Sequence, residues 1–207
     1  MNQIMQHDCW GGGSPVAGHY YAESLGTPFK VYLTNGVETK VVLGKTVTSI
    51  IDLPGLITTV VQSRVLHPRK LSGPDLKYIR SALCLKSKEL AAALGLSPEH
   101  YSRLENGERT MSVATEKLYR MYVFLAPFPR DKNIRNAISQ QKAKEISAEK
   151  TAKAFAALRK IFLGLKVDPV CSAEETLEFV FSRVSRRSLT CGESDAEWEN
   201  DVDPIAA

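Results

Sequence analysis

The stretch Leu85–Gly107, LKSKELAAALGLSPEHYSRLENG, carries the strongest structural signal in this 207-residue chain. It reads as two short helices joined by a tight turn at Gly95, the pattern of a helix-turn-helix. Ala91 is small where the two helices would cross, and Tyr101 is placed to fill their shared core. Ser97-Pro98-Glu99 begins the second helix with an N-cap, a proline and an acidic residue. This helix would turn its polar residues outward, toward a DNA major groove about 12 Å wide.

The same stretch resembles the XRE (Cro/CI-type) helix-turn-helix family. The resemblance rests on three runs: Lys88-Glu89-Leu90-Ala91, Leu94-Gly95-Leu96-Ser97 and Ser102-Arg103-Leu104-Glu105-Asn106-Gly107. The chain departs from the family at Lys86, where a capping serine is common, and Ser87 is the alternative cap. The resemblance implies a transcriptional regulator that binds double-stranded DNA.

Upstream, the run HYYAESLGTPFKVYLTNGVETK, followed by a helix and by LSGPDLKYIRSAL, is similar to the MqsA/YgiT-type antitoxins. That similarity implies an N-terminal zinc-binding β-domain that holds a toxin ribonuclease, and a dimer that represses its own genes. The two C-x-x-C pairs of the family are missing, and only Cys9 with His7 nearby precedes the first strand. A tetrahedral zinc site needs four ligands. We therefore expect no metal and no cofactor.

The resemblance places Glu99 and Arg103 where MqsA-type proteins read bases. Arg103 could donate two hydrogen bonds to guanine, and Glu99 could accept one from cytosine. His100 and Ser102 flank them and are further base candidates. Candidate phosphate contacts lie at helix ends and in the following loop: Ser87, Lys88, Ser97 and Arg109.

Each of these residues has a second interpretation without DNA. Arg103 could pair with Glu99 or Glu105 on the helix surface, and an acidic residue such as Glu99 stabilises a helix N-terminus by itself. His100 could be ordinary exposed surface. Asn106-Gly107 is the expected stop of the helix.

In the N-terminal part, Phe29, Val31 and Leu33 alternate with polar residues, which is typical of a strand. Asn35-Gly36 predicts a type I′ hairpin to Val37–Leu43, and Thr46–Ile50 would complete a meander. Asp52 is then expected to begin a helix that ends at His67-Pro68.

Four helices are expected between Ser72, an N-cap, and Phe124. The last would bury Val113, Leu118, Met121 and Tyr122. A second helix of the following extension would begin at Ser172 and bury Leu177, Phe179, Val180 and Val184.

The predicted fold class is α+β, with a small N-terminal antiparallel β-domain, a central all-α helix-turn-helix domain and a C-terminal helical extension. The expected segments are a flexible leader (1–18), the β-meander plus helix (19–70), the helix-turn-helix domain (71–127), the extension (128–187) and a disordered acidic tail (188–207).

Composition narrows the function further. Hydrophobic residues make up 43% and charged residues 24%, and no apolar run is long enough to span a membrane. Neither a secretion signal nor a cysteine framework is apparent, so we expect a cytoplasmic protein without a membrane partner. The net charge of +4 combines 13 basic and 7 acidic residues over 126–187 with six acidic and no basic residues over 188–207. Motifs of phosphate loops, serine hydrolases and zinc proteases are missing, and we expect no enzyme.

The first functional hypothesis is a sequence-specific regulator, acting as an autorepressor, that binds an inverted-repeat operator as a homodimer. The alternative is an antitoxin that neutralises a toxin, or another protein partner, through its N-terminal domain and autoregulates its operon. A third interpretation is non-specific binding of RNA or DNA through the basic segment 126–187. Dimerisation could use the helix after the recognition helix, the extension or the β-domain.

Overall fold

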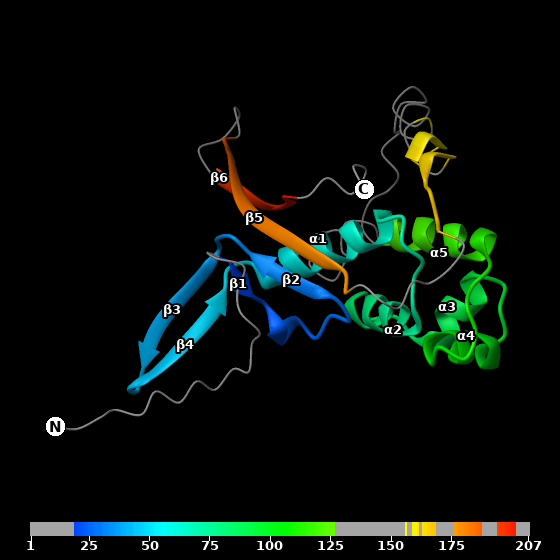
Figure 1. The fold of residues 1–207 in the computed structure, drawn as a ribbon, viewed down its shortest axis with the longest axis horizontal. Helices are drawn as coiled ribbons and strands as arrows, with labels where there is room; N and C mark the ends of the chain where they lie inside the picture. Colours follow the sequence, from blue (N-terminus) through cyan, green and yellow to red (C-terminus); the bar gives the residue numbers. More distant parts are fainter. Residues whose placement is uncertain are drawn as a thin grey trace, which may run out of the picture.

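The computed structural model describes residues 19–126, 156, 159–161, 163–168, 176–187 and 194–201, with only the backbone described at 185–187 and 194–195. Strands from the two ends of the chain and helices from its middle make an α+β fold, as predicted (Figure 1). The predicted leader 1–18 lies outside the described residues, and so do residues 128–155, 157–158, 162 and 169–175 of the predicted helical extension 128–187. Of that segment, residues 156, 159–161 and 163–164 are helical.

A four-stranded sheet joins the two ends of the chain. Its strands, in spatial order, are β1 (Tyr20–Tyr21), β2 (Lys30–Leu33), β5 (Glu178–Arg187) and β6 (Ser194–Asn200). β2 and β5 are parallel, and the other neighbours are antiparallel. A short 3-10 helix, Glu23–Leu25, lies between β1 and β2.

Two predictions for the C-terminal part are therefore wrong. The helix expected after Ser172 is β5 over residues 178–187, and residues 194–200 of the expected disordered tail form β6. The physical reason is a two-residue period: Phe179 and Phe181 are buried, whereas Val180 and Ser182 are only partly covered. Trp198 is 5% exposed in β6, and its indole N–H donates to the Asp52 carbonyl at 3.2 Å.

A separate hairpin consists of β3 (Val37–Val42) and β4 (Lys45–Ile50). The predicted hairpin turn at Asn35-Gly36 is wrong, because the turn lies at Leu43-Gly44, where both residues have positive φ. Asn35 instead uses its side chain to bond the backbone N–H and carbonyl of Arg183 in β5. Gly36 lies under Trp198, and a Cβ there would come within 2.5 Å of the indole ring.

Helix α1 (Leu53–Leu66) connects the sheet to the other helices. As predicted, Asp52 is its N-cap, accepting the Gly55 N–H at 3.2 Å, and the helix ends before His67. Its residues belong to two buried clusters. Leu56 and Val60 pack with the sheet, and Val61 and Val65 pack with the helices that follow.

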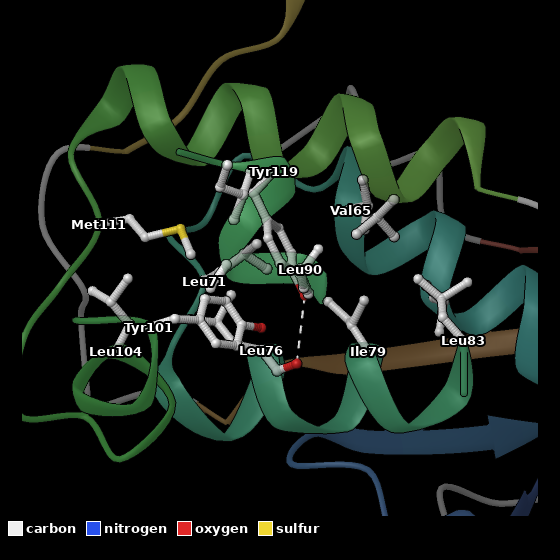
Figure 2. Close-up of a cluster of buried hydrophobic side chains, with 14 residues drawn as sticks. Val65, Leu71, Leu76, Ile79, Leu83, Leu90, Tyr101, Leu104, Met111 and Tyr119 are labelled. Atoms are coloured by element: carbon white, nitrogen blue, oxygen red, sulfur yellow. Dashed lines mark hydrogen bonds between the residues drawn. The ribbon is translucent and has the colours of Figure 1, made fainter. Parts of the chain in front are cut away.

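The helical part contains α2 (Gly73–Ala82), α3 (Ser87–Ala93), α4 (Pro98–Glu105) and α5 (Val113–Leu125). The predicted caps at Ser72 and Ser97 accept the N–H of Asp75 and His100. Figure 2 shows the shared core, including Leu76, Ile79, Leu90, Tyr101, Leu104 and Tyr119. The buried face of α5 was predicted wrongly, because Val113 and Leu118 are each 40% exposed whereas Tyr119 and Val123 are buried.

Two charged residues also occupy the buried face of α5. Glu116 accepts from Arg120 at 2.7 Å and from the backbone N–H of Leu71 at 2.8 Å, and Lys70 lies 3.3 Å from its carboxylate. Arg120 in turn donates to the carbonyls of Val65, His67 and Arg69. This buried network ties the loop between α1 and α2 to α5, so charge as well as apolar periodicity sets the orientation of α5.

Candidate nucleic-acid interface

Helices α3 and α4 meet around small and apolar side chains, as the sequence predicts. Ala91 and Leu90 of α3 are fully buried against Tyr101 of α4. The turn between the helices contains Gly95 at φ +66°, a conformation that glycine adopts without steric cost. The Leu96 N–H donates to the Ala91 carbonyl at 2.9 Å and closes the end of α3. These contacts fix the second helix of the motif relative to the first.

Helix α4 has one buried and one exposed face. Tyr101 and Leu104 are 0% and 1% exposed and point into the core. The four predicted base-reading residues are all exposed: Glu99, His100, Ser102 and Arg103. Because Glu99 and Arg103 are four positions apart, they lie one helical turn from each other on the outer surface. The structure thus brings the predicted set together on one accessible helix.

The predicted phosphate contacts lie at the start of α3, at the N-cap of α4 and after the end of α4. Lys88 on α3 and Arg109 after α4 are exposed, and Ser87 is partly covered at the start of α3. Ser97 is exposed and is occupied as the N-cap of α4, accepting the His100 N–H at 3.1 Å. Its hydroxyl proton is not used in that bond and is donated to the Glu99 carboxylate, whose pKa it lowers.

Glu99 is held in the ionised form at the N-terminus of α4. The pKa of its carboxyl is lowered, first by its own backbone N–H and the Ser97 hydroxyl, and then by the charges of Arg103 and Lys88. The structure therefore favours the capping interpretation of Glu99 while leaving its carboxylate exposed to solvent. An ionised acceptor at this place can receive a hydrogen bond from a base amino group.

Arg103 does not form the surface ion pairs that its second interpretation predicts. Glu105, one of its two expected partners, is bound by Arg80 of α2 at 2.6 Å. Within the described part of the chain, Arg103 forms no ion pair within 4 Å. Its guanidinium is thus available for the bidentate geometry that guanine recognition requires.

The expected helix stop at Asn106-Gly107 is present, because Gly107 has φ +74° and α4 ends at Glu105. Ser87 does not cap α3. The N-cap position is occupied by Lys86, and Ser87 is the first helical residue. The Glu89 carboxylate instead accepts the Lys86 N–H at 3.4 Å. The short α3 therefore begins with a weak cap.

Helix α2 supports α4 from behind, through residues that the sequence interpretation missed. Arg80 bonds both carboxylate oxygens of Glu105 and also the Leu85 carbonyl at 3.2 Å. Gly73 lies so close to the end of α4 that a Cβ there would be 2.5 Å from the Glu105 carbonyl oxygen. Only the three-dimensional approach of α2 to α4 shows these roles, because no local spacing links Gly73 or Arg80 to α4.

Neither a metal centre nor a membrane helix occurs in the described residues. No group of three or more His, Cys, Asp or Glu there is arranged to hold a metal ion. None of the described helices has the length and apolar character to cross a bilayer. Cys9 and His7, the two possible zinc ligands that precede the first strand, lie outside the described residues.

Comparison with known proteins supports the helix-turn-helix directly. A family model described as helix-turn-helix matches residues 76–115, which span α2 to the start of α5. The match confirms the predicted helix-turn-helix motif. It supports a DNA-binding regulator of the XRE type and does not support the closer similarity to MqsA/YgiT-type antitoxins. No curated protein and no solved structure matches the chain.

Proposed function

We propose that the chain is a sequence-specific transcriptional regulator that reads an operator through α4. The observation that carries this proposal is the division of α4 into a fully buried face and an exposed polar face. The buried face, Tyr101 and Leu104, fixes the helix on the domain. The exposed face presents Glu99, His100, Ser102 and Arg103 to a major groove.

In this proposal Arg103 donates two hydrogen bonds to guanine, and Glu99 accepts one from the cytosine amino group. His100 and Ser102 contact neighbouring base edges. Phosphate contacts from Ser87, Lys88, Ser97 and Arg109 set the position of the helix in the groove without reading sequence. Arg80 positions α4 through Glu105 and does not touch DNA itself.

Two copies are required for useful specificity, because one helix-turn-helix reads only a few base pairs. We propose a homodimer on an inverted repeat whose half-sites lie about one helical turn apart. Binding over its own promoter would exclude polymerase, so autorepression is the regulatory outcome of this arrangement.

A DNase footprint on the DNA upstream of the gene tests the proposal. The wild-type chain should protect a two-fold symmetric site, and Arg103→Ala should lose about 1–3 kcal/mol of binding free energy together with specificity at one base pair of each half-site. Arg159→Ala is the matched control, because Arg159 is an exposed arginine of the basic C-terminal segment. It should leave the footprint unchanged.

Two results would contradict this assignment. One is equal protection by the wild-type chain and Arg103→Ala. The other is uniform binding to all sequences with a steep salt dependence that Arg159→Ala weakens, which would favour the non-specific interpretation.

The antitoxin alternative is a second candidate because the hairpin β3–β4 of the N-terminal part exposes four apolar side chains: Val41, Val42, Leu43 and Val47. It predicts a small toxin gene beside this one and a stable complex between the two products. Capture must use the full chain, because residues 1–70 lack β5 and β6 of their own sheet. Capture of the neighbouring gene product by the full chain would move this candidate to first place.

A further inference from the structure

The hairpin β3–β4 projects from the body of the molecule (Figure 1). All residues from 38 to 49 are exposed, whereas Val37 and Ile50 at its base pack against the buried cluster of the four-stranded sheet. A two-stranded hairpin by itself is only marginally stable in water. Within the described part of the chain, both faces of the hairpin beyond its base are left uncovered.

The two faces of the hairpin differ in charge. The register pairs Thr39 with Thr48 and Val41 with Thr46. Because side chains alternate along a strand, these four lie on the same face as the basal pair. We call this the uncharged face: Val37, Thr39, Val41, Thr46, Thr48 and Ile50. The other, charged face consists of Glu38, Lys40, Val42, Lys45, Val47 and Ser49.

The tip of the hairpin keeps an apolar side chain in water at a conformational cost. Leu43 is 98% exposed and has φ +51°, followed by Gly44 at φ +75°. Asparagine is preferred at the first of these turn positions because it tolerates positive φ, and leucine does not. Leu43 adjoins other exposed apolar side chains, Val41, Val42 and Val47, so that an apolar patch lies at the end of the hairpin.

We propose that the uncharged face and Leu43 bind the same surface of a second copy of this chain. An uncharged, β-branched face meets its own copy without like-charge repulsion, whereas the charged face carries two lysines, Lys40 and Lys45, and one acid, Glu38. DNA is a poorer occupant, because the uncharged face has no cation and, of the two lysines on the other face, Lys40 already pairs with Glu38 at 2.8 Å, which leaves Lys45. The inference rests on the proposed function, which requires two copies on one operator.

The size of the face determines how strong this contact can be. Strands of six residues are about 20 Å long and about 5 Å apart, so each copy contributes roughly 200 Å². Stable interfaces bury about 1,200–2,000 Å² in total. The hairpin contact therefore gives weak association in free solution. It becomes effective when adjacent half-sites hold two copies close together and raise their effective concentration.

Sedimentation equilibrium of the full chain, from micromolar to near-millimolar concentration, tests the proposal without DNA. Val41→Lys places a charge on the uncharged face, and Val47→Lys is the matched control on the charged face; the two valines are 73% and 47% exposed. Val41→Lys should weaken self-association at least about tenfold, and Val47→Lys should leave it nearly unchanged. Circular dichroism on both variants verifies that the fold is retained.

Two further variants, Leu118→Lys and Arg103→Ala, distinguish a failure of the hairpin proposal from a failure of the operator proposal. Leu118→Lys alters an apolar groove formed by Leu83, Leu85, Met121 and Leu125 on the helical side. If Leu118→Lys alone abolishes the dimer, or if the wild-type chain is monomeric throughout, the hairpin proposal is overturned. Arg103→Ala should self-associate like the wild-type chain. A dimer sensitive to Val41→Lys in a protein that leaves no footprint would remove the operator proposal and leave the hairpin contact standing.

Discussion

His67 ends α1 in surroundings that oppose a positive charge. Its ring is half-buried and meets Phe179 edge to face at 5.8 Å, and its Nδ1 accepts the Arg69 N–H at 3.1 Å. Burial lowers the pKa of His67 to about 4, with Arg64, Arg69 and Arg120 adding to the effect and Asp168 opposing it. The folded chain therefore keeps this imidazole neutral at pH values where the unfolded chain protonates it.

This difference predicts a pH-dependent stability. Between pH 4 and the ordinary pKa of 6.5, the unfolded state binds the extra proton, so the free energy of unfolding should fall as pH falls. The slope is at most about 1.4 kcal/mol per pH unit and smaller for a half-exposed ring. His67→Asn keeps an acceptor for the Arg69 N–H but does not titrate. Urea unfolding at several pH values should give a flatter profile for this variant; parallel profiles would contradict the assignment.

At the residue scale, the exposed face of α4 was predictable, whereas the partners that hold the helix were not. The residues that face outward on α4 follow from helical periodicity once Tyr101 and Leu104 are taken as core. The partner of Glu105 was not predictable. Arg80 lies 25 positions earlier in the chain, and no local spacing indicates that its side chain reaches α4.

At the level of elements, the contact between α2 and α4 determines where α4 lies in the domain. Gly73 lets the start of α2 approach the end of α4, and an added Cβ would lie 2.7 Å from the Gly107 nitrogen as well as close to the Glu105 carbonyl. Backbone atoms cannot move aside as a flexible side chain can. The fit of these two helices therefore depends on the absence of a side chain at this position.

Gly73→Ala should consequently destabilise the domain by about 1–3 kcal/mol, although alanine is the better helix former. It should also weaken operator binding, because α4 must shift to accommodate the methyl group. Gly164→Ala is the control: Gly164 is helical, and nothing lies within 4 Å of an added Cβ. Urea unfolding of both variants checks the prediction, and equal stability of the two would show that α2 and α4 tolerate the added volume.

Helix boundaries were predictable because caps and breakers act locally. Asp52, Ser72, Ser97 and Ser112 each accept a backbone N–H three residues ahead. The hairpin was not predictable on the same basis. Asn35-Gly36 has the favoured turn sequence, but the Asn35 side chain hydrogen-bonds to Arg183 of β5, 148 positions away. The turn is instead formed by the less favourable pair Leu43-Gly44. Tertiary contacts overrode the local preference.

At the scale of the whole molecule, the sheet is completed by the C-terminal part of the chain. β2 pairs in parallel with β5, and the Lys30–Glu178 ion pair at 2.7 Å lies across that boundary. Disorder was predicted for residues 188–207 from their acidic composition alone. Composition does not take into account the order of residues, in which the acidic side chains of β6 flank the buried Trp198. Trp198 of β6 packs against Gly36 and donates to the Asp52 carbonyl, which adds to the pairing of β6 with β5 and attaches β6 to the N-terminal part.

Trp198→Ala tests whether the C-terminal strands stabilise the N-terminal sheet. Trp198 is 5% exposed, covers Gly36 and donates to the Asp52 carbonyl, so its loss should cost about 3–5 kcal/mol of unfolding free energy. Val184→Ala on β5 is the control, because Val184 is 37% exposed and its loss should cost about 1 kcal/mol or less. Amide hydrogen exchange should then accelerate in β2 and the first turn of α1 more than in α4. Unchanged exchange in β2, with Trp198→Ala as stable as the wild-type chain, would mean that the tail contributes no stability to the sheet.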